Sequence, residues 1–393
     1  MKPDYRRTVH ACFIGYIVQA IVNNFAPLLF LTFQDSYNIP LPKITMLITI
    51  NFSLQLMTDL LSAGFVDKIG YRASALIAHI LSAAGLICLT FLPEVFPDPF
   101  IGLLLAVMIY AVGGGLLEVL ISPIVQACPT DNKEKTMSLL HSFYCWGYVG
   151  VVLCSTLFFN LFGIGNWKIL CLIWAFIPIA NALVFIKVPI APLMSDGEKG
   201  LTIKELARKK VFWFFMLLML CAGASEQAVS QWASTFAEQG IGVSKTIGDL
   251  MGPMFFAAMM GVTRLIYGKR GDNIDLNRFM IYSSILCVFS YLIISLSRVP
   301  AFGLIGCGLC GMSVGILWPG TYSMASSAIK GGGTAMFAFL ALAGDLGCSA
   351  GPTLVGLVSS AAGNNLKMGI LIGTVFPVVL LFSMMRKRKT QKV

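Results

Sequence analysis

Residues 100–127 read FIGLLLAVMIYAVGGGLLEVLISPIVQA, an apolar run long enough to cross a membrane as one helix. Glu118 interrupts this run nine residues before Ala127. At a helical rise of about 1.5 Å per residue the carboxyl lies about 13 Å from that end, close to the middle of the hydrocarbon core. An ionisable group at that depth costs about 2.5 kcal/mol or more, so it normally faces a polar cavity and has a function. Two interpretations stay open: a carboxyl that binds a proton or a substrate, and a structural carboxyl bonded to a neighbouring helix.

The surroundings of Glu118 indicate a helix that packs closely and bends. Three consecutive glycines, residues 113–115, allow a neighbouring helix to approach the backbone. Pro123 removes a backbone donor about one turn after the acid. We therefore expect a moving helix that carries a functional carboxyl.

The composition is that of an integral membrane protein. Hydrophobic residues make up 57% of the 393 residues, and charged residues only 12%, against about 25% in soluble proteins. With this balance the net charge of +10 does not indicate a nucleic-acid partner; the expected surroundings are a lipid bilayer. Nearly all of the eleven cysteines lie in apolar runs, so we expect neither disulfides nor a metal or redox site.

Twelve segments have the length and apolarity of membrane-spanning helices. We expect an all-α membrane protein with spans at residues 9–34, 43–65, 74–92, 99–127, 138–160, 167–188, 211–237, 246–267, 275–297, 301–327, 333–361 and 366–385.

The positions of the charges predict the orientation. With the N-terminus in the cytoplasm, all but five of the 28 Lys and Arg residues fall on the cytoplasmic side, which is the positive-inside pattern. The exceptions are Lys43, Lys168, Lys245, Arg298 and Lys367. The first apolar run is too long for the core of a cleavable signal peptide. We expect both termini in the cytoplasm, and the short loops favour a bacterial inner membrane.

The longest polar stretch divides the chain into two sets of six helices. We expect an N-terminal bundle at 1–188, a cytoplasmic linker at 189–210 with a short helix near 203–209, and a C-terminal bundle with a basic tail at 211–393. The halves resemble each other: WGYVG at 146–150 corresponds to AGDLG at 343–347. Paired six-helix halves are typical of a rocking transporter.

The loop between the second and third spans carries a recognisable pattern. Residues 63–72 read AGFVDKIGYR, which resembles the G-x-L-x-D-R-x-G-R-R loop of the major facilitator superfamily. Asp67, Gly70 and Arg72 match, Lys68 replaces an arginine, and a degraded copy that includes Arg264 follows the eighth span. The resemblance implies two six-helix bundles and a role for these residues in holding one gate state. For Asp59, close by in sequence, we also favour a gate role.

Within that superfamily the chain resembles the group of fucose permeases and sodium-dependent glucose transporters. Glu118 stands five residues before Pro123, as in their E-T-A-x-N-P segment, which implies a role in protonation or sugar binding. Asn23 stands where the fucose permease has an aspartate, so a relay of two carboxylates is not implied. His141 and Tyr144 replace an amide pair of the fifth span, which argues against fucose itself.

The residue types support a polar solute independently of the resemblance. Sugars require side chains that donate and accept hydrogen bonds, together with flat apolar surfaces. Such groups gather in the spans that line the cavity in the superfamily. The expected substrate-binding residues are Gln19, Asn23, Asn24, Glu118, His141, Tyr144, Glu226, Gln227, Gln231, Trp232, Trp318 and Tyr322.

A smaller set of titratable groups could couple transport to an ion. We expect Glu118, His141 and Asp345 to serve this purpose, although Asp345 fits a structural hydrogen-bonding role equally well. His79 stands alone in its span, and we interpret it as structural. The complete set of gating candidates is Asp59, Asp67, Gly70, Arg72 and Arg264.

These features favour a secondary transporter that imports a sugar or sugar-like solute by alternating access, driven by H+ or Na+, and acting as a monomer without cofactor or metal. The alternative is a proton-coupled exporter of drugs or metabolites. Such exporters carry a Gly-Pro pattern in the fifth span, whereas this chain has Gly351 and Pro352 in the eleventh. The absence of catalytic and phosphate-binding motifs argues against an enzyme.

Overall fold

The computed structural model describes residues 5–129, 133–191, 201, 203–270, 274–330 and 332–390. Within them, twelve helical segments are long and apolar enough to cross a membrane, and no β-strand is present. The predicted all-α fold with twelve spans is confirmed. The chain divides into two units, Met1–Asp196 and Gly197–Val393. The predicted linker, 189–210, crosses this division, and its residues 192–200 and 202 lie outside the described part of the chain.

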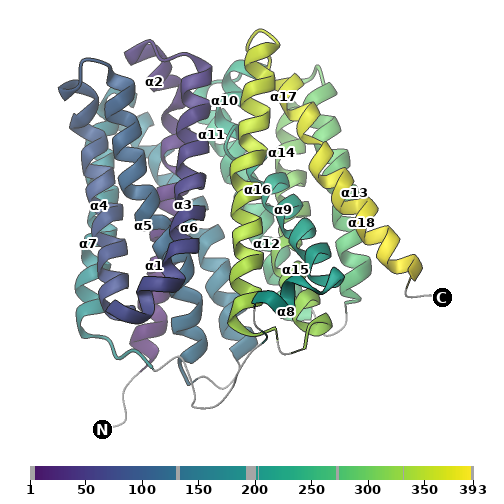
Figure 1. Ribbon diagram of the computed structural model, residues 1–393. Coiled ribbons are helices and arrows are strands. Elements are labelled where there is room, and N and C mark those ends of the chain that lie inside the picture. Colours follow the sequence, from purple (N-terminus) through teal and green to yellow (C-terminus); the bar gives the residue numbers. More distant parts are fainter. Residues whose placement is uncertain are drawn as a thin grey trace. The chain divides into compact units, whose positions relative to one another are not determined.

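The first unit contains spans one to six (Figure 1). Its helices are α1 (Arg6–Asn24), the 3-10 turn η1 (Ala26–Leu29), α2 (Phe30–Tyr37), α3 (Leu41–Ile69), α4 (Tyr71–Val95), α5 (Pro99–Ala127), α6 (Lys133–Phe162), the 3-10 turn η2 (Ile164–Asn166) and α7 (Trp167–Lys187).

The second unit contains a short helix, α8 (Ile203–Ala207), and spans seven to twelve. The other helices are α9 (Lys210–Ser230), α10 (Ala233–Thr235), the π-helix η3 (Phe236–Gly240), α11 (Lys245–Asp249), the π-helix η4 (Leu250–Met254), α12 (Phe255–Arg270), α13 (Leu276–Leu296), α14 (Pro300–Val314), α15 (Leu317–Ala328), α16 (Gly333–Ala361), α17 (Leu366–Gly373) and α18 (Val375–Thr390).

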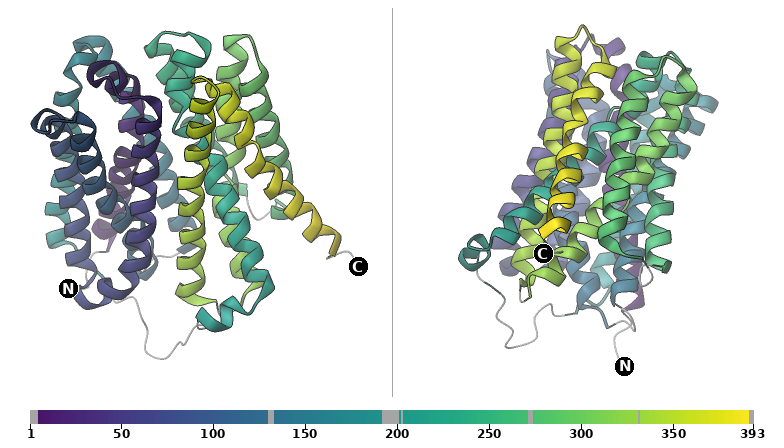
Figure 2. Two further views of the ribbon diagram at one scale, coloured as in Figure 1. Left: turned by 45° about the horizontal axis from the view of Figure 1, so that its top comes forward. Right: turned by 90° about the vertical axis from the view of Figure 1, so that its right-hand side faces the viewer.

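One helix in each unit packs against several others. In the first unit α5 packs against α1, α3 and α4; in the second, α9 packs against α14, α15 and α16. Glycines make these approaches possible: a Cβ at Gly113 would lie 2.6 Å from the backbone nitrogen of Ser82, and one at Gly347 would lie 2.0 Å from the carbonyl oxygen of Leu220. Figure 2 shows α16 (yellow-green) and the other long helices of its unit running alongside one another. The close contacts hold the polar residues of α1, α5 and α9 in fixed surroundings.

Several of the spans are not continuous α-helices, and three of these, spans one, seven and ten, carry candidate site residues near the interruption. Span one changes from α1 to a 3-10 turn just after Asn24, where Pro27 carries no backbone N–H. Span seven leaves α-helical geometry after Ser230, and span ten is interrupted between Val314 and Leu317. Interrupted spans in transporters accompany substrate and ion sites, because the freed backbone groups line polar cavities.

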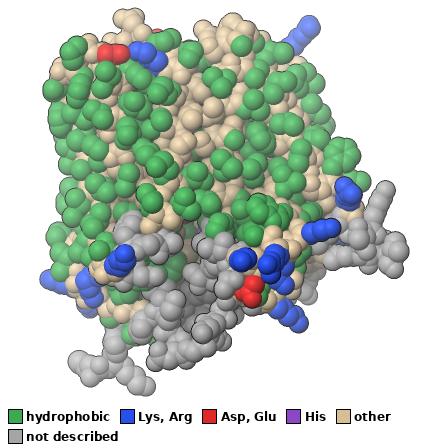
Figure 3. Space-filling view, in the orientation of Figure 1, with side chains coloured by type: hydrophobic (Ala, Val, Ile, Leu, Met, Phe, Trp, Pro, Cys, Tyr) green, Lys and Arg blue, Asp and Glu red, His purple; other side chains and the backbone are tan. Residues whose placement is uncertain are grey.

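The surface agrees with a lipid environment. On the visible face of each unit, hydrophobic side chains cover the middle, and the Lys and Arg side chains lie towards the ends (Figure 3). Many large apolar side chains are exposed, among them Leu161 and Phe176, as expected for a protein whose surface contacts lipid. Lys43 binds Asp98 at 3.0 Å, and Lys168 pairs with Glu94, so these two cations tie together neighbouring helix ends of the first unit.

Candidate functional site

The polar groups of the first unit centre on one face of α1. Gln19 donates from Nε2 to Oε2 of Glu118 on α5 at 2.7 Å. One turn earlier, the Tyr16 hydroxyl lies 2.9 Å from Oγ of Ser122, also on α5. Gln19 is buried, whereas Glu118 is partly exposed. The carboxyl of Glu118 is therefore held by an amide, and the residue as a whole is not fully buried.

The next turn of α1 contacts α3. Oδ1 of Asn23 accepts a hydrogen bond from Nε2 of Gln55 at 2.7 Å and a longer one from Nδ2 of Asn51 at 3.4 Å. Gly115 permits this arrangement, since a Cβ there would lie 2.9 Å from Cα of Gln55. Sequence reasoning did not select Asn51 or Gln55. Their signal was present, because two amides one turn apart in an apolar span face the same side of a helix.

Two residues of α6 complete this group. Asn24 donates from Nδ2 to the hydroxyl of Tyr144 at 3.2 Å. The ring of His141 lies 5.3 Å from the ring of Tyr16, centroid to centroid. His141 thus lies beside a tyrosine whose hydroxyl contacts the Glu118 helix. We call these residues the N-terminal polar cluster: Tyr16, Gln19, Asn23, Asn24, Asn51, Gln55, Glu118, Ser122, His141 and Tyr144.

The second unit has a corresponding group around α9. Gln231 donates to Oε1 of Gln227 at 2.9 Å, and Gln227 donates to Oε1 of Glu226 at 3.4 Å. Oε2 of Glu226 lies 3.5 Å from a guanidinium nitrogen of Arg264 on α12, and each side chain is only 10% exposed. We call Glu226, Gln227, Gln231 and Arg264 the C-terminal polar cluster. Arg264 had been expected at a gate, and the structure places it beside an expected substrate residue.

The aromatic candidates of the second unit differ in their surroundings. Trp232 is fully buried and donates from its indole nitrogen to the carbonyl oxygen of Pro352 at 3.0 Å, which fixes α16 against the end of α9. Trp318 and Tyr322 are partly exposed on α15, with ring centroids 6.3 Å apart. Trp318 and Tyr322 are therefore better placed than Trp232 to meet a solute.

Asp345 lies on α16 and is buried. Its neighbour Gly344 touches the Trp318 ring, since a Cβ there would lie 2.1 Å from Cη2 of the indole. The backbone of α16 next to Asp345 therefore makes a tight contact with α15. The buried position of Asp345 agrees both with a role in ion coupling and with a structural hydrogen-bonding role.

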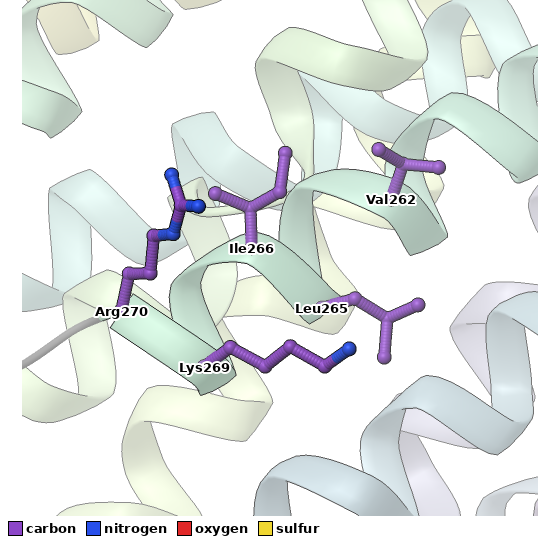
Figure 4. Close-up of a pocket in the computed structure, with 5 residues that line it drawn as sticks. All are labelled: Val262, Leu265, Ile266, Lys269 and Arg270. Carbon is purple, nitrogen blue, oxygen red and sulfur yellow. The ribbon is translucent and has the colours of Figure 1, made fainter.

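A hollow of about 400 Å³ on the surface of the second unit is lined by residues of one helix only, as Figure 4 shows. These are Val262, Leu265, Ile266, Lys269 and Arg270 of α12. None of them is a candidate substrate residue, and the lining is almost entirely apolar. This hollow is not part of the candidate site.

Comparison with known proteins assigns the family. The family model of the Major Facilitator Superfamily matches residues 11–352. The chain belongs to the major facilitator superfamily. Its members are transporters, so the expectation that the chain is not an enzyme is confirmed.

Solved structures show the same superfamily fold at low sequence identity. The E. coli fucose:proton symporter FucP is 17% identical with a TM-score of 0.69, over 96% of this chain and 97% of that one. The E. coli xylose transporter XylE, partially occluded and inward open, is 14% identical with a TM-score of 0.77, over 97% of both chains. A bacterial homologue of the human lysosomal transporter Spinster is 14% identical with a TM-score of 0.76, over 100% of this chain and 98% of that one. No curated protein matches the sequence.

The superfamily loop lies where α3 meets α4. Gly70 has a φ of +86°, which an L side chain rarely adopts, and Arg72 donates to the carbonyl oxygens of Phe185 and Ile186 at 2.9 and 2.5 Å. Arg72 thereby caps the C-terminal end of α7, where a cation is favoured. Asp59 is buried in α3, and the side chain of Asp67 lies outside the described residues.

The gating role of Asp67 leads to a prediction about rates. Asp67→Asn should slow transport and leave the equilibrium affinity for the solute nearly unchanged, because the residue would bias two conformations without touching the solute. Uptake rate and binding should be measured on the same preparation. A variant with native turnover, or one that loses binding, would contradict the assignment.

Sequence reasoning also did not select a charged group where η3 and α11 connect span seven to span eight. Lys245 lies 3.4 Å from Oε1 of Glu238 and 3.2 Å from Oδ2 of Asp249, and Ser234 donates to Asp249. Burial raises the pKa of Glu238, and the ion pair with Lys245 opposes that shift only in part. Charged Glu238 is therefore less favoured in the folded protein than in water.

This shift predicts a pH effect. An acid with a raised folded-state pKa adds stability below its ordinary pKa, and that contribution is lost as the pH rises through the folded-state value. Between about pH 5 and about pH 7, the unfolding temperature of the native protein should therefore fall relative to that of Glu238→Gln. Thermal unfolding of both proteins in detergent at the two pH values tests this. Parallel behaviour of the two proteins would show that Glu238 titrates normally.

Proposed function

We propose that this chain is a proton-coupled symporter that imports a sugar or sugar-like solute by alternating access. The observation that carries the proposal is the carboxyl of Glu118, a partly exposed residue of a membrane-spanning helix, which Gln19 holds at 2.7 Å. An ionisable group inside a membrane span is costly and normally has a function, and a carboxyl can bind and release a proton. Proton binding at this carboxyl then drives solute entry, and His141 and Asp345 are further candidate proton sites.

The polar side chains around Glu118 support a hydroxyl-rich solute. Most are amides, which both donate and accept hydrogen bonds, as the hydroxyl groups of a sugar require. Oδ1 of Asn24 is buried and accepts no hydrogen bond from the described residues, so a donor from the solute would satisfy it after a small movement. Trp318 and Tyr322 offer flat surfaces for the C–H faces of a sugar ring. The structurally similar proteins FucP, a fucose:proton symporter, and XylE, a xylose transporter, agree with this class of solute.

The cellular setting is part of the proposal. The protein acts as a monomer in the cytoplasmic membrane of a bacterium, with both termini in the cytoplasm and without a cofactor. The positive-inside distribution of Lys and Arg supports this orientation.

Uptake by proteoliposomes tests the proposal. A panel of radiolabelled hexoses and pentoses is offered with an inward proton gradient or an inward sodium gradient, each imposed alone. We expect at least one sugar to accumulate with the proton gradient and only to equilibrate with the sodium gradient. Accumulation driven by sodium alone would contradict proton coupling. If no sugar is transported and cationic dyes are extruded, the alternative function as an exporter is favoured.

The amide pair at the end of α9, Gln227 and Gln231, gives a prediction about affinity. Replacing Gln231 with Ala leaves one solute hydroxyl and Oε1 of Gln227 without a partner, which should weaken apparent affinity by about 1–3 kcal/mol. The same loss is expected for Gln227→Ala and for Asn23→Ala. Gln239→Ala is the matched control, because Gln239 is exposed on η3. Native affinity in all three cluster variants would remove these residues from the site.

A further inference from the structure

The interruption of span ten has an identifiable cause. In a continuous helix the carbonyl of Gly315 would accept from the N–H of residue 319. That residue is Pro319, which has no N–H. The bond is lost, and α14 ends at Val314 while α15 begins at Leu317. The Gly315 carbonyl therefore needs a donor from outside the helix, because a buried carbonyl without a partner is costly.

Arg264 provides this donor. Its Nε donates to the Gly315 carbonyl oxygen at 3.2 Å. The preceding residue, Thr263, donates from Oγ1 to the carbonyl oxygen of Met312 at 2.8 Å. The approach is close, since a Cβ at Gly315 would lie 2.8 Å from Cβ of Thr263. Helix α12 thus bonds to the backbone of span ten at the break and just before it.

The guanidinium is itself held in place by span seven. Oε2 of Glu226 lies 3.5 Å from a terminal nitrogen of Arg264, while Nε of the same side chain faces Gly315. Arginine suits this position because its planar group presents several donors in a fixed geometry, which lysine does not. Spans seven, eight and ten are therefore joined through one side chain.

The break sets the direction of the helix that carries two candidate solute contacts. Trp318 is the second residue of α15, and Tyr322 follows one turn later. Gly344 of α16 touches the indole of Trp318, so a small tilt of α15 would shift this contact. Hinges in transport proteins lie at such helix ends, where a few residues absorb the change in backbone angles.

We propose that Arg264 is the positioning residue of a hinge in span ten: it replaces the donor that Pro319 removes and so directs Trp318 and Tyr322 of α15. The role of these two aromatic residues rests on the proposed function. The bond between Arg264 and the hinge does not, and it is tested without any solute.

The test compares two double variants in which residues 226 and 264 are both uncharged. We call them the glutamine pair and the methionine pair after the residue at position 264. In Glu226→Gln/Arg264→Gln, Nε2 of the new glutamine occupies the place of the arginine Nε and donates to Gly315. In Glu226→Gln/Arg264→Met, a side chain of similar length has no donor. Both pairs lack the two charges, so a difference between them reports the hydrogen bond to the hinge.

Hydrogen exchange of purified protein in detergent, followed by mass spectrometry of peptides covering residues 312–322, gives the first result. We expect exchange about tenfold faster in the methionine pair than in the glutamine pair, as loss of one hydrogen bond requires, with peptides of α13 unchanged. Adding Pro319→Ala restores a backbone donor and should remove the difference. Equal exchange in the two pairs, or a difference that persists with Pro319→Ala, would overturn the proposal.

Uptake gives the second result. With a sugar identified by the panel, the methionine pair should show a several-fold higher KM than the glutamine pair, and Pro319→Ala should reduce this difference. Unequal exchange with equal KM would overturn the link from the hinge to Trp318 and Tyr322. If no sugar is transported, the proposed function fails, and the exchange result still decides whether Arg264 holds the hinge.

Discussion

Arg264→Met in an otherwise native chain is expected to lower the free energy of unfolding by about 3–5 kcal/mol, because it leaves the Glu226 carboxylate buried without its cation. Both side chains are only 10% exposed, so water replaces little of the lost interaction. Thermal unfolding in detergent and the yield of monodisperse protein measure the effect.

Two variants separate charge burial from simple loss of an arginine. Arg278→Met removes an arginine whose side chain is 61% exposed, and it should leave the unfolding temperature nearly unchanged. Glu226→Gln/Arg264→Met removes both charges and should recover most of the stability that the single substitution loses. If Arg264→Met alone is as stable as Arg278→Met, the ion pair between Glu226 and Arg264 does not form in the membrane protein.

Glu118→Gln is expected to abolish accumulation of the solute against its gradient. The amide resembles the protonated carboxyl, so the carrier still binds solute and reorients, but it no longer binds and releases a proton. Exchange of labelled for unlabelled solute should therefore continue at a rate within a few-fold of native. Uptake and exchange are measured in parallel in proteoliposomes.

Glu94→Gln is the matched control for this substitution. Glu94 pairs with Lys168 at an exposed helix end, and its side chain is 61% exposed. The control should accumulate solute like the native protein. Native accumulation by Glu118→Gln would reduce Glu118 to a binding or packing group, and sodium coupling, with Asp345 as a candidate, would become the better account.

The number and order of the spans could be predicted from sequence because each span is a local property. An apolar run of sufficient length forms a helix in lipid, where every backbone group must be bonded internally. The same reasoning selected Glu118, since a single acid in residues 100–127 stands out against its apolar neighbours. The break after Asn24 also has a local signal in Pro27.

The partners of these residues could not be predicted, because they depend on how helices are rotated against one another. Gln55 lies 32 positions from Asn23 along the chain, and nothing in either span indicates that they meet. The same holds for Arg264, which looked like the remnant of a loop and instead reaches Glu226 on another helix. Trp232 was expected to contact the substrate because it is aromatic, but its side chain is enclosed between α9 and α16.

Proton movement caused by the solute is the most direct test of the account. Proteoliposomes that contain a pH-sensitive dye and no imposed gradient are mixed with the sugar that the panel identifies. If Glu118 couples sugar to proton entry, the interior acidifies as sugar enters through the native protein and through Glu94→Gln, and its pH stays constant with Glu118→Gln. Sugar entry through the native protein without acidification would contradict proton symport, and acidification through Glu118→Gln would contradict the assignment of Glu118 as the coupling site.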